Sequence, residues 1–253
     1  MSEAKYIQPA PSSFDDAHKP KVEQLILDFR KADVELVKQE LKIQAPLFEK
    51  RAEIVADVEN FWFQSMVNCM AMNVYIDDAD HEALSYLSGV RVERDLDDPR
   101  AATIVFSFRE NPFFSDAELV KKFPLAEGAK TLEEQFNFVE ETVPQKTEIN
   151  WKSDDKNLCK LKPTVGGRDS DDFEPGSFFS TFFANTDTEV AGGIGHTIMV
   201  DWFPNALDFY LGEDTFDDED FDSEEDEEDE DDEDAEIDLE AEEERPKKKT
   251  KAN

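Results

Sequence analysis

The stretch FSFRENPFFSDAELVKKF, residues 106–123, has alternating apolar residues on both sides of a polar, proline-containing segment, ENPFFSD (110–116). Alternation of this kind places the apolar side chains on one face of a strand, and the intervening segment has the composition of a turn. The stretch therefore predicts two antiparallel strands. The residues that share a face are Ile104, Phe106 and Phe108 before the turn, and Leu119, Phe123 and Leu125 after it.

Two further alternations extend this sheet. Val90 and Val92 precede the turn-like segment DLDDPR (95–100). Thr147, Ile149 and Trp151 follow a longer excursion at 126–145. We therefore expect an antiparallel meander of four strands.

Helical periodicity flanks the strands. Between 48 and 73, apolar residues recur every three or four positions, which is typical of a core helix. SFFSTFFAN (177–185) and a segment ending at 214 are expected to lie as helices on the sheet, with breaks at Gly192-Gly193 and at Pro204. The predicted fold class is α+β, an antiparallel sheet covered by helices.

A long N-terminal helix is predicted to begin at Pro20, and its apolar seam alternates spacings of three and four residues. Because no equally long partner follows in the sequence, we expect the seam to meet a second copy of the chain. Packing on its own domain is the alternative. Pro46 lacks a backbone donor and is expected to kink or break this helix. The predicted dimer-interface residues are Val22, Leu25, Phe29, Ala32, Leu36 and Ile43.

These patterns divide the chain into four parts. A disordered N-terminal arm (1–19) precedes the dimerisation helix (20–47), and an α+β domain follows (48–212). The last part (213–253) is expected to be a disordered acidic tail with a basic terminal motif, since it has too few apolar residues to build a core.

The charge of the chain is strongly negative, at −36. Residues 213–244 contain 24 acids in 32 positions and no base, yet the net charge of residues 1–212 is still about −17. Such a field repels nucleic acid and attracts polycations, so nucleic acid is expected to be only an indirect partner.

The sequence predicts neither a catalytic centre nor a cofactor site. Its two cysteines and three histidines have no metal-ligand or nucleophile spacing, and GGIG (192–195) lacks the context of a dinucleotide loop. We expect a protein that is not an enzyme and holds no metal beyond weak, diffuse ion binding. The sequence contains no run of about 18 apolar residues, so it predicts no membrane span.

The tail ends in RPKKKTK (245–251), which has the composition of a nuclear import signal and could alternatively fold back on the acids. Ser223, followed by acids, is a hypothetical phosphorylation site. A tail that only confers solubility is a further alternative. The predicted import residues are Lys247, Lys248, Lys249 and Lys251.

Several blocks together resemble the nucleosome assembly protein family. FSFRENPFFSDAELVKKF is similar to its strand–turn–strand signature, and PLFEKRAEIVADVENFW (46–62), SFFSTFFANTD (177–187) and DWFPNALDFYLGED (201–214) agree with it. EALSYL (82–87) and TEINWK (147–152) resemble the SET (template-activating factor) branch.

This resemblance implies a homodimer joined by the N-terminal helices, with an "earmuff" domain on each that binds core histones through acidic residues. It identifies as histone-binding candidates Glu110, Asp116, Glu118, Thr186, Asp187 and Glu189. The leading hypothesis is an ATP-independent histone chaperone in nucleosome assembly and disassembly, located in the nucleus and shuttling with the cytoplasm. An import receptor would be a further partner. The alternative is an acidic regulatory inhibitor of a phosphatase or of a histone-modifying enzyme.

Overall fold

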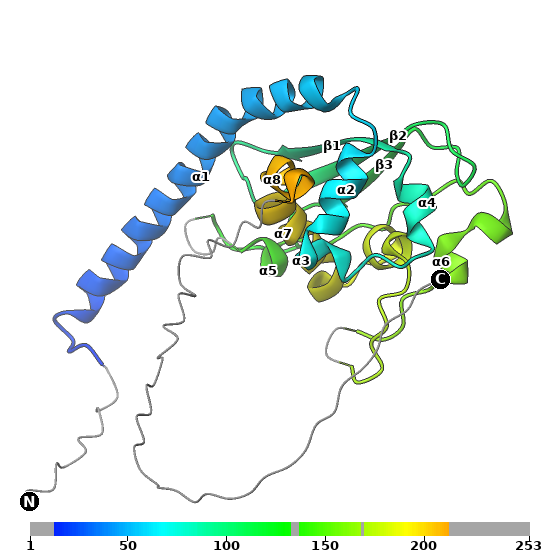
Figure 1. The fold of residues 1–253 in the computed structure, drawn as a ribbon. Coiled ribbons are helices and arrows are strands. Elements are labelled where there is room, and N and C mark those ends of the chain that lie inside the picture. The colour runs from blue at the N-terminus through cyan, green and yellow to red at the C-terminus, as the bar shows by residue number, and fades with distance from the viewer. Residues whose placement is uncertain (1–12, 133–136, 168–169, 213–253) are drawn as a thin grey trace, which may run out of the picture. The chain divides into compact units, whose positions relative to one another are not determined.

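The computed structural model describes residues 13–132, 137–167 and 170–212, and its centre is a three-stranded sheet. β1 (Leu87–Arg94), β2 (Ala102–Phe108) and β3 (Glu118–Phe123) pair antiparallel in the order β1-β2-β3 (Figure 1). Phe106 lies opposite Val90 on β1 and Leu119 on β3. The meander predicted around residues 106–123 is confirmed.

The prediction of a fourth strand at Thr147–Trp151 is wrong. The chain from 145 to 151 lies between β3 and a helix and divides its hydrogen bonds between them. The amide of Gln145 donates to Lys122 O at 2.8 Å, whereas that of Thr147 donates to Phe183 O at 2.8 Å. Trp151 forms only an isolated bridge with Phe114. A ladder cannot form where successive amides face different partners.

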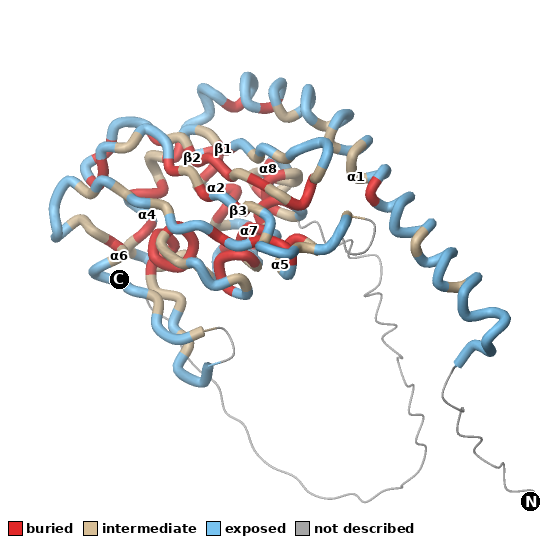
Figure 2. The backbone as a smooth tube through the Cα atoms, turned by 180° about the vertical axis from the view of Figure 1, so that it is seen from behind, coloured by how far each residue is buried: buried red, intermediate tan, exposed pale blue. Residues whose placement is uncertain are grey.

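Helices cover one face of the sheet and enclose a core rich in phenylalanine (Figures 1 and 2). Phe106 is fully buried, and its ring centroid lies 5.3 Å from that of Phe183 and 6.1 Å from that of Trp202. Truncating such a ring typically costs about 3–5 kcal/mol. The helices of this layer are α2 (Phe61–Asn68), α3 (Met70–Asn73), η2 (Phe179–Ala184), η3 (Thr188–Gly192), α7 (Gly193–Thr197), η4 (Ile198–Trp202) and α8 (Ala206–Leu211).

The helical run from 188 to 202 is not interrupted at Gly192-Gly193, contrary to the sequence-based expectation. The glycine that matters is Gly195, which packs against β3. A Cβ there would lie 2.5 Å from Cζ of Phe123, so only glycine permits this close approach. The run ends as predicted before Pro204, and α8 follows.

The N-terminal helix α1 (Lys19–Val55) has 37 residues and continues through Pro46, so of the kink or break expected at this proline the break is absent. Its axis turns in the C-terminal third (Figures 1 and 2). Tertiary contacts hold the turns beyond the proline. Arg51 Nη1 donates to Phe203 O and to Pro204 O at 3.0 Å, and its guanidinium lies 4.4 Å from the Phe203 ring centroid. Burial lowers the pKa of Arg51 to about 10.

Four short elements complete the described structure. They are α4 (Asp80–Leu84), α5 (Phe138–Glu141), η1 (Asp154–Lys156) and α6 (Leu158–Leu161). The predicted arm at its residues 1–12, the acidic tail, Ser223 and the four import lysines lie outside the described residues.

Candidate functional site

The loop that contains Thr186 and Asp187 follows helix η2, whose two ends contact buried charged side chains. At the N-terminal end, Asp80 accepts a hydrogen bond from Phe178 N at 2.7 Å and another from Ser177 Oγ. At the C-terminal end, Lys121 Nζ donates to Phe183 O at 3.3 Å and to Asn185 O at 2.5 Å. An acid at the first end and a base at the second both complement the helix dipole.

The interior position of these two side chains changes how they titrate. Burial raises the pKa of Asp80, although the hydrogen bonds from Ser177 and Phe178 act in the opposite direction. Burial lowers the pKa of Lys121 to about 7. A neutral amine keeps two N–H donors, which match the two carbonyls that Lys121 contacts.

The predicted residues Thr186 and Asp187 are exposed in this loop, and Glu189 is exposed in the first turn of η3. Asp187 Oδ1 accepts from the amides of Glu189 and Val190, both at 2.9 Å, and so caps η3. Asp187 therefore fixes the backbone that presents Thr186 and Glu189, in addition to carrying negative charge.

The other predicted acids surround the turn between β2 and β3. Asp116 accepts from Asn150 N and Nδ2, both at 2.7 Å. Glu118 forms an ion pair with Arg91 at 2.7 Å, and the hydrogen bond from Arg91 lowers the pKa of that carboxyl. Glu110 is exposed. Two of the three acids are thus partly engaged by other side chains.

Among the described residues, no hydrogen bond or ion pair joins these two groups of candidates. They are connected through the segment between β3 and η2, because Asn150 bonds to Asp116 while Thr147 bonds to Phe183. The structure supports each group locally and does not bring the two into direct contact.

A cleft between α1 and the helical layer was not predicted from the sequence. It comprises a cavity of about 800 Å³, to which Glu189 contributes, and one of about 610 Å³. Both cavities are lined by Glu40, Arg94, Met199 and Val200. No sequence motif signals this cleft, because its walls come from segments far apart in the chain.

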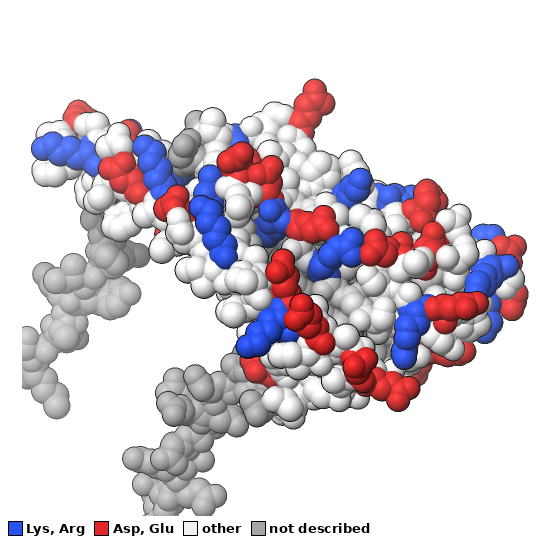
Figure 3. Space-filling view, turned by 90° about the horizontal axis from the view of Figure 1, so that it is seen from above, with Lys and Arg blue, Asp and Glu red and all other residues white. Residues whose placement is uncertain are grey.

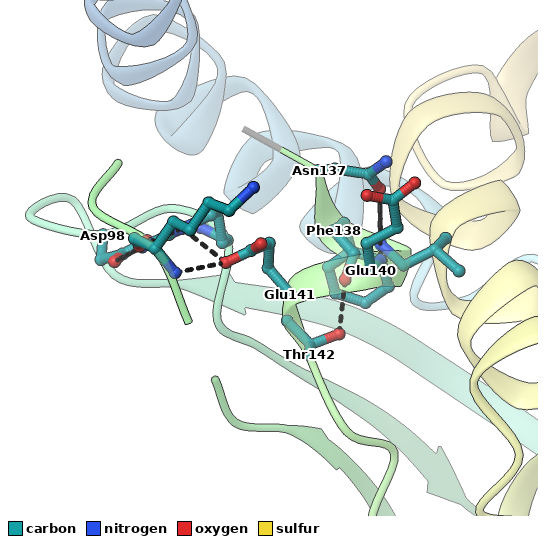
Figure 4. A network of polar contacts seen from close by, with 9 residues as sticks. Asp98, Asn137, Phe138, Glu140, Glu141 and Thr142 are labelled. Atoms are coloured by element: carbon teal, nitrogen blue, oxygen red, sulfur yellow. Dashed lines mark hydrogen bonds and ion pairs between the residues drawn. The ribbon is translucent and has the colours of Figure 1, made fainter. Parts of the chain in front are cut away.

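The wall of the cleft formed by α5 is held by a polar network (Figure 4). Asn137 Oδ1 accepts from the amides of Val139 and Glu140 and caps the helix. Glu141 is buried and pairs with Arg100 at 3.2 Å, and Arg100 also pairs with Asp98 at 2.7 Å. The network ties α5 to the connection between β1 and β2.

The predicted dimer residues lie along the outward face of α1. Leu25, Phe29, Leu36 and Ile43 are 54%, 63%, 68% and 66% exposed, Ala32 is exposed, and Val22 is half-buried. The apolar stripe continues at Leu47 and Ile54. In contrast, Val34 and Val55 are buried on the opposite side. The helix thus has one apolar face packed on its own domain and a second that is open in the single chain (Figure 2).

Acidic and basic side chains are interspersed over the face drawn in Figure 3. No helix in the described part of the chain is both long and apolar enough to span a bilayer. The same residues contain no cluster of three or more His, Cys, Asp or Glu side chains suited to a metal ion.

Comparison with known proteins gives one consistent result. The family model described as "Nucleosome assembly protein (NAP)" matches residues 38–247. The chain is 36% identical over 189 residues to "Protein SET" of Drosophila melanogaster, covering 73% of this chain and 68% of that protein. It is 32% identical over 181 residues to "Protein SETSIP" of Homo sapiens, covering 70% and 58% respectively.

Solved structures agree at the level of the fold. The crystal structure of Ccp1 superposes with a TM-score of 0.61 at 25% identity, covering 79% of this chain and 96% of that one. A nucleosome assembly protein from Plasmodium falciparum gives a TM-score of 0.54 at 21% identity, covering 78% and 93%. The family match, the SET relatives and the shared fold together show that this chain belongs to the nucleosome assembly protein family, in its SET branch.

Proposed function

We propose that this protein is an ATP-independent histone chaperone that binds core histones through its acidic surfaces. The observation that carries the proposal is the charge of a chain with this fold. Residues 1–212 have a net charge of about −17, and with the tail included the net charge of the chain is −36. Core histones are polycations, so their neutralisation releases counterions from both partners.

The proposed mechanism is competition between two polyanions. The chaperone covers basic histone surfaces, prevents nonspecific contacts with DNA, and releases the histones when correctly placed DNA competes for them. Glu110, Thr186 and Glu189 are the most available contacts, because each is exposed and none forms an ion pair within the described residues. Asp116, Glu118 and Asp187 contribute charge while they also support the local backbone.

Two copies are proposed to join through the exposed stripe of α1. Side chains such as Phe29 and Leu36 are more than 60% exposed in the single chain, and a matching stripe would remove them from water. The proposed location is the nucleus with shuttling to the cytoplasm, and the import motif at 247–251 would bind an import receptor.

The test is a titration of purified dimer with each of the two core-histone pairs across a salt series, for the full chain and for a chain lacking 213–244. We expect binding at physiological salt, a steep loss of affinity with salt, and a smaller salt slope after the deletion. Failure to bind either histone pair at physiological salt would overturn the proposal. If extract pull-downs capture mainly a phosphatase or a histone-modifying enzyme, the regulatory-inhibitor interpretation gains support.

A further inference from the structure

We propose that the cleft between α1 and the helical layer is a separate docking site for a basic amphipathic segment of a core histone. This inference rests on the proposed function and adds to it a specific place and a specific kind of segment. The site is distinct from the loop after η2 and from the turn between β2 and β3, although Glu189 contributes to its rim.

The two cavities of the cleft are adjacent, because four residues line both of them. α1 forms one wall with Val37, Leu41 and Phe48. The opposite wall includes Met199 and Val200 of η4. Volumes of about 610 and 800 Å³ are large enough to receive several side chains of a partner.

The smaller cavity of the cleft exposes apolar side chains next to polar and charged ones. The smaller cavity is lined by Leu41, Phe48, Leu96 and Phe203 together with Val200. Val200 is 52% exposed and Leu96 is 44% exposed, so an apolar occupant would bury surface that water now contacts. The charged residues at this end include both Lys42 and Glu93, which leave it without a dominant charge.

The lining of the larger cavity has more acidic than basic side chains. Glu40, Glu140 and Glu189 line the larger cavity. Of the two arginines there, Arg100 is paired with Asp98 and with the buried Glu141. Arg94 Nε donates to Pro99 O at 2.7 Å. The negative charge of Glu40 stabilises the charged form of Arg94. Glu189 is exposed at the rim of this cavity, where a lysine or arginine of the occupant would complement its charge.

The acidic wall does not need to form on binding. Asn137 caps α5, and the Arg100–Glu141 pair ties that helix to the β1–β2 connection (Figure 4). A wall held in place in this way reduces the entropy that association must offset.

Dimerisation through α1 is compatible with an open cleft. Leu36 of the exposed stripe and Val37 of the cleft are consecutive, so their side chains point about 100° apart around the helix axis. A second copy packed on Leu36 and Ile43 therefore approaches α1 from another side than an occupant in contact with Val37 and Leu41.

The first experiment places the photo-crosslinker p-benzoyl-phenylalanine at Val200 in the full-length chain and irradiates it with each core-histone pair bound in turn. We expect a crosslink to one histone segment that has lysine or arginine next to apolar residues. A crosslink found only between two copies of this chain would overturn the proposal, because it would assign the cleft to self-association. The absence of any histone crosslink at saturating histone would overturn it as well.

The second experiment compares Val200→Arg with Leu207→Arg, which lies on α8, is 44% exposed, and lines neither cavity. Val200→Arg should weaken histone affinity about tenfold through like charge and steric filling, whereas the control should stay within about twofold. Equal affinities of the two variants and the unsubstituted chain would contradict the docking site while leaving the chaperone function intact. Failure of the unsubstituted chain to bind histones would overturn both.

Discussion

Asp80 of α4 and Lys121 of β3 contact opposite ends of the same six-residue helix, η2, and both side chains are fully buried. The acid binds the amide of Phe178 and the base binds the carbonyls of Phe183 and Asn185. Because the loop with Thr186 and Asp187 begins directly after this helix, the two buried side chains help to position that loop. Their substitution therefore tests both stability and the geometry of the loop.

Lys121→Met should change how stability depends on pH. The pKa of Lys121 in the folded chain is about 7, below its ordinary value, so between pH 7 and about 10 the unfolded chain binds a proton that the folded chain does not. Stability therefore rises with pH in this window, by about 1.4 kcal/mol per pH unit at most, and the variant should lack this rise. Urea unfolding at about pH 7.5 and about pH 9 measures it. Lys122→Met, at an exposed position, is the control, and identical pH slopes in both variants would show that Lys121 does not titrate in this way.

Asp80→Ala should lower the free energy of unfolding by about 2 kcal/mol, because it removes a helix cap and leaves Ser177 and the amide of Phe178 without their acceptor. Asp80→Asn keeps one acceptor oxygen and should cost less. Chemical denaturation of the two variants provides the comparison. An asparagine variant less stable than the alanine variant would contradict the capping role.

Gly195→Ala should destabilise the fold by about 1–3 kcal/mol, because the added Cβ would lie 2.5 Å from the Phe123 ring. Gly167→Ala serves as the control, since nothing lies within 4 Å of a Cβ at that position. Thermal unfolding should separate the two variants by several degrees. An unchanged melting temperature for Gly195→Ala would mean that Phe123 moves aside freely.

Phe29→Asp combined with Leu36→Asp should yield monomers, because both side chains lie on the exposed stripe of α1 and charge at a buried seam is costly. Light scattering gives the mass in solution. Lys31→Asp combined with Lys42→Asp changes charge at exposed positions outside the predicted seam and should leave the dimer intact. A persistent dimer in the first variant would place the interface elsewhere.

Much of the fold could be predicted because its periodicities are local. The alternations around ENPFFSD predict β2 and β3, and the spacing in SFFSTFFAN predicts a helix on the sheet. Lys121 shares the parity of Leu119 and Phe123, so the alternation of β3 implies that this lysine is buried. A base at an apolar position of a strand is therefore a signal that the sequence alone contains.

Other features depend on contacts that no local pattern contains. α1 continues past Pro46 because Arg51 and Val55 pack on the domain, and residue 195 must be glycine because the Phe123 ring lies against it. The segment Thr147–Trp151 alternates like a strand, but η2 takes the amide of Thr147. The cleft combines α1 with segments near 94–100, 137–140 and 188–205, so it exists only after tertiary packing.

The two apolar faces of α1 have a thermodynamic consequence. One helix forms both the stripe proposed for self-association and a wall of the cleft proposed for a histone segment. If an occupant of the cleft changes the position or rigidity of that helix, the dimerisation constant changes by some factor, and linkage requires dimerisation to change the occupant's affinity by the same factor. Measuring self-association with and without bound histone would therefore yield the coupling free energy between assembly and cargo binding.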